Sequence, residues 1–240
     1  MIRPLFLFIL FLQSLGTMAQ EKDEPQKEFF RISGRGGERF RPTIPTFGYA
    51  KLERLVEEAD TNKRSYTAAP IPAQVLNTLS QEEKFTWCMA FPESFMQICT
   101  LFHYDSLAYK IFAHLPMVEM GTVMSARQRD FLKQERNLTI RLMRQSISDS
   151  VFIGLNYKEV IRDLLLVELI PEVISNYNRT KDKDLLTLLI ELMEKKQHQP
   201  WLSSSLRLEL EQQSRLPRYK RAVPFTSNNA YHILKYATEK

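Results

Sequence analysis

A succession of amphipathic helical segments, separated by capping residues and prolines, is the feature that most constrains the fold. From residue 125 to residue 213, apolar residues recur at intervals of three and four, which places them on one face of an α-helix. Two capping boxes, Ser80-Gln81-Glu82-Glu83 and Ser125-Ala126-Arg127-Gln128, mark helix starts. The sequence therefore predicts an all-α chain, in which residues 151–153 are the only short candidate for a strand.

These helices can be assembled in two ways. A repeat array requires a fixed period with recurring anchor residues over at least three units, and no such period is found. We therefore expect a compact helical bundle of about seven to nine helices, with a short αα-hairpin solenoid as the alternative. The expected helices cover residues 50–59, 80–89, 95–102, 106–114, 125–146, 157–170, 184–197, 202–213 and 227–236.

One of these segments is predicted to be central. Apolar residues lie nearly all round the segment 160–170, a pattern typical of a helix buried on every side. Asn156 is the expected N-cap of this helix, and Pro171 is expected to kink or restart it. Towards the end of the chain, Pro200 is expected to stop a helix and Ser227 to cap the last one.

The amino terminus has the pattern of a secretion signal. Arg3 precedes an uninterrupted apolar run, Leu5 to Leu12, and small and polar residues lead to Ala19. The run is much shorter than the roughly 20 residues that a membrane-spanning helix needs. No later stretch is long and apolar enough to cross a bilayer. The sequence thus predicts a signal peptide over residues 1–19 and export to the periplasm or the extracellular space.

The remaining chain divides into a leader and a domain. Residues 20–48 hold three prolines and four of the seven glycines, together with many charges, so this stretch is expected to be a flexible leader. Its phenylalanines would need cover, so we expect part of the leader to pack on the domain. Residues 49–240 are expected to form a single helical domain.

Two cysteines, Cys88 and Cys99, remain after removal of the signal. In an oxidising compartment such a pair often forms a disulfide. Pro92 lies between them and predicts a turn, which would bring the two antiparallel arms together. The sequence therefore favours a Cys88–Cys99 bridge. The alternative is two buried free thiols, which behave as small apolar residues.

The segment around Cys99 also holds the only candidates for catalysis. Cys99 and His103 are four residues apart and would share one helix face, as a thiolate–imidazole pair requires. Asp105 could orient the imidazole, and His114 lies further along the chain. The segment is rich in aromatic residues and Met, however, which is typical of a core helix. No His-Glu-x-x-His or Cys-x-x-Cys pattern and no glycine-rich phosphate loop occurs, so neither a metal nor a cofactor is expected.

Basic residues gather in two places. With 33 Lys and Arg against 28 Asp and Glu, the chain is mildly basic, and no motif for specific nucleic-acid binding is present. The first group lies in the leader, where solvated charge is the alternative explanation, and the second in a Pro-flanked segment that also resembles a dibasic cleavage site. Both are candidates for binding an anionic partner. They comprise Arg35, Arg39, Arg41, Arg215, Arg218, Lys220 and Arg221.

Together these features favour a non-enzymatic protein over an enzyme. A patterned helical core without site chemistry is typical of an interaction module, whose partner would be a protein, a glycan or another anionic component of the cell envelope. Two alternatives stay open: an exported enzyme with a site between Cys99 and His114, and a carrier of a small apolar ligand held between helices.

Overall fold

The structure is a computed structural model, and it describes residues 41–59, 70–97, 109–116 and 120–239. These ranges contain eleven α-helices and four short strands, so the expected predominantly helical class is confirmed. The helices are α1 (Tyr49–Ala59), α2 (Ala73–Leu76), α3 (Gln81–Ala90), α4 (Ala126–Gln134), α5 (Arg136–Asp149), α6 (Leu155–Asp163), α7 (Ile170–Thr180), α8 (Lys183–Lys195), α9 (Gln199–Leu202), α10 (Ser205–Gln212) and α11 (Ser227–Thr238). The strands are β1 (Ser94–Gln97), β2 (Lys110–Phe112), β3 (Met120–Val123) and β4 (Ala222–Pro224).

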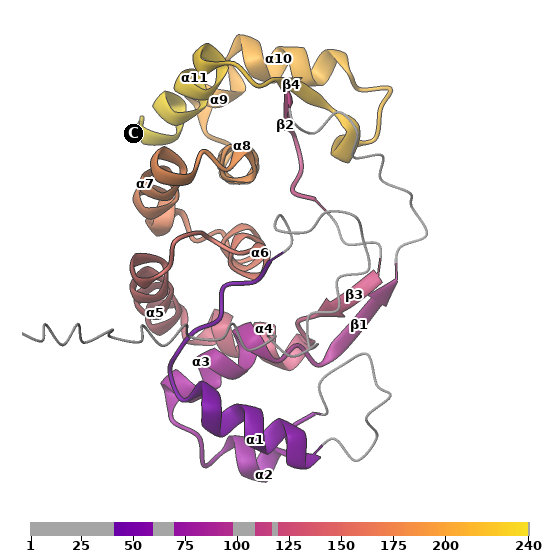
Figure 1. The fold of residues 1–240 in the computed structure, drawn as a ribbon. Helices are drawn as coiled ribbons and strands as arrows, with labels where there is room; N and C mark the ends of the chain where they lie inside the picture. Colours follow the sequence, from indigo (N-terminus) through magenta and orange to yellow (C-terminus); the bar gives the residue numbers. More distant parts are fainter. Residues whose placement is uncertain (1–40, 60–69, 98–108, 117–119, 240) are drawn as a thin grey trace, which may run out of the picture.

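The helices follow one another along an arc, from α1 and α2 at one end to α10 and α11 at the other (Figure 1). The strand pairs lie on the inner side of this arc. Helix α8 packs against α6, α7, α9, α11 and β2, and every residue from Asp184 to Met193 is buried. The central role predicted for residues 160–170 therefore belongs to α8.

Both capping boxes are confirmed. The Ser80 hydroxyl accepts the backbone N–H of Glu83 at the start of α3, and the Glu83 carboxylate accepts the N–H of Ser80. Ser125 and Gln128 make the equivalent pair of bonds at the start of α4. Two of the four donors left free at each helix start are thereby satisfied locally.

The prediction of a single helix over residues 125–146 is wrong in one respect. The chain breaks at Glu135, whose backbone angles of φ −93° and ψ 42° are not helical, and α5 starts afresh at Arg136. Eleven helices occur in the described ranges where seven to nine were expected, because two expected helices are each divided in two and the four-residue helices α2 and α9 are added, while strands lie where two other helices were expected.

The prediction of one continuous helix from 157 to 170 is also wrong. Helix α6 ends at Asp163, and the chain turns through Leu165 in the left-handed region with φ 51°. The Arg136 guanidinium supports this turn by donating to the Leu164 and Leu165 carbonyl oxygens at 2.7 and 3.0 Å. Helix α7 then restarts with Pro171 in its first turn, as expected. The apolar residues that seemed to surround one helix are divided between the end of α6, the turn after it, the 3-10 helix Val167–Leu169 and the start of α7.

Two small antiparallel sheets replace helices that the sequence predicted. Strand β1 lies where a helix over 95–102 was expected and pairs with β3, with Phe95 opposite Thr122. Strand β2 lies within the helix expected over 106–114 and pairs with β4, with Ile111 opposite Val223. Residues 151–153, the expected strand, are not in a strand.

The last third of the chain follows the predictions more closely, with α8, α10 and α11 in their expected places. Two details differ. Pro200 lies in the first turn of α9, where it starts a helix, and Thr226 caps α11 through the N–H of Asn229. The N-cap of α6 is Gly154 and not Asn156.

Residues 41–48, the described part of the expected leader, pack against the helical domain. Pro42, Thr43 and Pro45 are buried. This segment passes so close to Gly154 that a Cβ there would lie 2.1 Å from the Thr43 nitrogen. Only glycine fits at such a backbone approach. Residues 1–40, which include the expected signal peptide, lie outside the described residues.

Cys88 is a free, buried thiol on α3, 3.5 Å from the Gln128 carbonyl oxygen. Burial, assisted by the Glu93 carboxylate, raises the pKa of this thiol well above its usual range. This environment agrees with the buried-thiol alternative for Cys88. Cys88 is not bridged in the structure, so the predicted Cys88–Cys99 disulfide is not found, and Cys99 itself lies outside the described residues.

None of the helices in the described part of the chain is long and apolar enough to span a membrane.

Candidate anion-binding site

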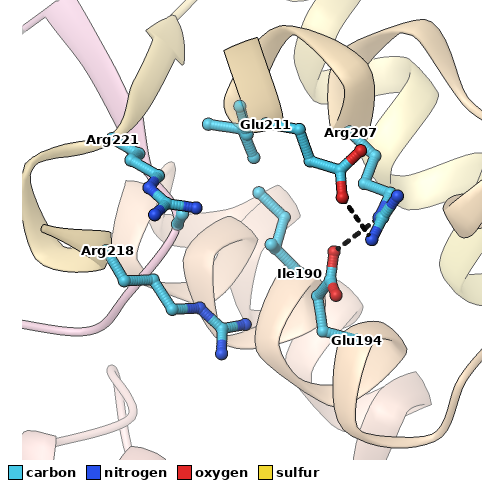
Figure 2. A pocket seen from close by; sticks show the side chains of 8 residues that line it. Ile190, Glu194, Arg207, Glu211, Arg218 and Arg221 are labelled. Carbon is cyan, nitrogen blue, oxygen red and sulfur yellow. Dashed lines mark hydrogen bonds and ion pairs between the residues drawn. The ribbon is translucent and has the colours of Figure 1, made fainter. Parts of the chain in front are cut away.

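A pocket of about 220 Å³ lies between α8, α10 and the short 3-10 helix Arg218–Lys220 with Arg221. Ala113, which follows β2, completes it. Figure 2 shows Arg218 and Arg221 on one side of the hollow and Arg207, Glu211 and Glu194 on the other. The pocket therefore contains two of the basic residues that the sequence singled out.

The basic wall is held in place by the backbone. The N–H of Ala113 donates to the Arg221 carbonyl oxygen at 2.9 Å, beside the β2–β4 pair. The Arg221 guanidinium in turn donates to the carbonyl oxygens of Leu216 at 2.9 Å and Ser214 at 3.2 Å. Within the described residues, neither Arg221 nor Arg218 forms an ion pair with a carboxylate. Two guanidinium groups thus line the pocket without a direct ion-pair partner among the described residues.

The opposite wall is an ion-pair network. Glu194 on α8 accepts the indole N–H of Trp201 at 2.8 Å and the Nε–H of Arg207 at 3.3 Å. Arg207 also lies 2.6 Å from a Glu211 oxygen, one turn along α10. One arginine therefore bridges two carboxylates and fixes their positions.

The lining as a whole combines charge with an apolar floor. Three arginines and two glutamates line the pocket, so its formal charge is positive. Ala113, Ile190 and Leu210 supply the apolar part, and all three are at least nine-tenths buried. Such a site can attract an anion to the Arg218 side and offers acceptors on the Glu211 side.

The other predicted basic residues are placed differently. Arg215 and Lys220 are exposed in the same segment but do not line the pocket. Arg41 lies over the Phe152 ring, 5.0 Å from its centre, in another part of the molecule. Arg35 and Arg39 lie outside the described residues.

Of the predicted catalytic candidates, only His114 is described. Its Nε2 lies 3.5 Å from an oxygen of Glu191, a buried residue of α8. The other Glu191 oxygen accepts the Leu115 N–H at 3.2 Å. Cys99, His103 and Asp105 lie outside the described residues, so whether they meet His114 stays untested.

A second carboxyl with unusual properties lies nearby in the charge network. Burial raises the pKa of Glu159 on α6 to about 7, against opposing effects of Arg162 and Arg129. The Asp163 and Glu191 carboxylates raise it further. Glu159 is therefore partly protonated near neutral pH.

No three or more His, Cys, Asp or Glu side chains come together in a way that could hold a metal ion in the ranges that the structure describes.

Sequence reasoning missed the acidic wall of the pocket. In the sequence, Glu194, Arg207 and Glu211 resemble ordinary surface charges of their helices. The i, i+4 spacing of Arg207 and Glu211 is the one signal that could have predicted an ion pair. Their meeting with Arg218 depends on how α8, α10 and the segment before β4 pack.

Comparisons with protein families, with curated proteins and with solved structures found no match to this chain.

Proposed function

We propose that this chain is a non-enzymatic helical interaction protein that binds an anionic partner through the segment 215–221 and the pocket beside it. The observation that carries the proposal is the pair of guanidinium groups, Arg218 and Arg221, that face the pocket without an ion-pair partner among the described carboxylates. Arg221 is half-buried and Arg218 is exposed, and the planar guanidinium of each can bind a planar anion through two N–H groups.

The expected compartment and class of partner come from the sequence. The pattern of residues 1–19 supports export, and the partner would then be a protein or another anionic component of the cell envelope. The order of helices along an arc favours the αα-hairpin solenoid over the compact bundle as the finer description of the fold (Figure 1). Solenoids commonly present extended surfaces for binding.

The test is the affinity for a fluorescein-labelled acidic peptide, for example a chain of eight glutamates, measured by fluorescence polarisation at low and at physiological salt. We expect Arg218→Gln to weaken binding about fivefold, and salt to weaken binding of the unchanged protein. Arg54→Gln is the matched control, because Arg54 is an exposed arginine on α1 with a bond only to its own helix. Equal losses in both variants, or none in either, would refute a binding role for this face.

An enzymatic role is kept as a second candidate by one observation, the His114 imidazole beside the buried Glu191 carboxylate. The Nδ1 atom of this imidazole lies 2.8 Å from the Leu115 carbonyl oxygen and donates to it, so Nε2, the atom beside Glu191, is the nitrogen that could act as a general base. If an activity is found, His114→Ala should abolish it while leaving the melting temperature nearly unchanged. A retained activity would remove this candidate.

A further inference from the structure

The two walls of the proposed pocket carry opposite charges, and a simple anion would interact favourably with only one of them. Arg218 and Arg221 lie on one side, and Glu194 and Glu211 lie on the other. The two carboxylates share a single arginine, Arg207, so their wall keeps an excess of negative charge. A doubly charged anion such as phosphate would be attracted by one wall and repelled by the other.

The size of the pocket is also informative. Its volume of about 220 Å³ is below the range of roughly 300–1,000 Å³ typical of drug-sized ligands. The floor between the charged walls is apolar and includes Ile190 and Leu210. The space therefore suits one amino-acid residue with an apolar side chain.

Resting on the proposed function, we infer that the pocket receives the terminal residue of a peptide chain. The terminal carboxylate accepts hydrogen bonds from the Arg218 guanidinium, and the backbone N–H of the same residue donates to Glu211. The side chain covers Ile190 and Leu210. A terminal residue carries the anion, the donor and the apolar group that these three parts of the pocket separately favour.

The probes are small molecules that each lack one of these groups. N-acetyl-leucine carries all three, N-acetyl-leucinamide lacks the carboxylate, and 4-methylpentanoate lacks the amide N–H. Inorganic phosphate reports on charge alone. Binding is followed by NMR through the Arg218 guanidinium and the Ile190 and Leu210 methyl signals, with ligand up to the order of 10 mM, where weak affinities are measurable.

We expect N-acetyl-leucine to shift these signals in a saturable way and to bind about tenfold more tightly than its amide. Arg218→Gln should remove this preference for the acid. Glu211→Gln should reduce the preference for N-acetyl-leucine over 4-methylpentanoate, because it removes the acceptor of the N–H, and comparing the two ligands cancels the change in total charge. Arg54→Gln should leave all of these ratios unchanged.

Other outcomes separate this inference from the proposed function. If the acidic peptide binds through Arg218 but N-acetyl-leucine gives no shift, the terminal-residue inference is wrong and the basic face stands. If phosphate and N-acetyl-leucine bind equally, the pocket is a general anion site and the inference is again wrong. A free amino acid as the natural ligand is distinguished by leucine itself, which would then bind more tightly than N-acetyl-leucine.

Discussion

Thr43 and Asn156 lie 113 positions apart and exchange hydrogen bonds: the Thr43 N–H donates to the Asn156 side-chain oxygen at 2.9 Å, and the Asn156 amide donates to the Thr43 carbonyl oxygen at 2.8 Å. The same amide donates to the Met89 carbonyl oxygen at 2.9 Å. Asn156 therefore joins the segment 41–48 and the end of α3 to the start of α6. The residue expected to cap a helix holds three parts of the chain together.

Asn156→Ala should lower the free energy of unfolding by about 2–3 kcal/mol, because it leaves the Thr43 backbone groups without partners in a buried place. Urea denaturation measures this directly. Asn178→Ala is the control, since Asn178 is exposed on α7. A change in Asn156→Ala no larger than in the control would mean that the segment 41–48 contributes little to stability.

Gln128→Glu should be destabilising by about 3 kcal/mol although it changes the shape of the side chain very little. The buried Gln128 amide donates to the carbonyl oxygens of Trp87 and Phe91 at 3.2 and 2.8 Å, and a carboxylate would place an oxygen against both. The thermal midpoint, compared with that of Gln134→Glu on the exposed face of α4, measures the effect. Equal midpoints in the two variants would contradict the role of this buried amide.

Glu159→Gln should stabilise the protein by about 2 kcal/mol at pH 8 and have almost no effect at pH 4, where the carboxyl is protonated in both states. Folding raises the pKa of Glu159 from 4.5 to about 7, so the native state binds the extra proton between these values. Its contribution to stability therefore falls as the pH rises through that window and is lowest above it. Unfolding curves at several pH values measure this change of the unfolding free energy with pH. Glu209→Gln on α10 is the exposed control. If the same pH dependence remained in Glu159→Gln, another group would be its source.

Cys88 should resist alkylation by iodoacetamide in the native protein and react after unfolding without any reductant. The thiol is buried, and its raised pKa disfavours the reactive thiolate. Intact mass before and after unfolding, with and without reduction, checks this. A requirement for reduction would contradict the free thiol and support the Cys88–Cys99 bridge.

Much of the helical architecture could be predicted because its signals are local. The capping boxes at Ser80 and Ser125 form through neighbours in the sequence, and α8 has a strong apolar pattern. The sheets could not be predicted, because β2 has only three residues and its partner β4 is more than a hundred positions away. Phe95 and Met96 fit a helical spacing as well as a strand, and short apolar runs do not distinguish the two.

The candidate site could likewise be predicted only in part from the sequence. The run of basic residues in the sequence identified the segment with Arg218 and Arg221. Glu194 and Glu211 join the site only through the packing of α8 and α10. The turn at Leu165 could not be predicted either, because a leucine does not favour φ 51° and the guanidinium that supports the turn belongs to Arg136, 29 positions earlier.

The bond from Ala113 to Arg221 has a consequence for the timing of synthesis. Residues on the two sides of this bond leave the ribosome about a hundred residues apart, or roughly 5–20 s at ordinary rates of translation. Until β4 has emerged and paired with β2, Arg218 and Arg221 lack the strand pairing that positions the basic wall of the pocket. A nascent or truncated chain that stops before β4 should therefore fold many of its helices and still lack the anion-binding site that we propose.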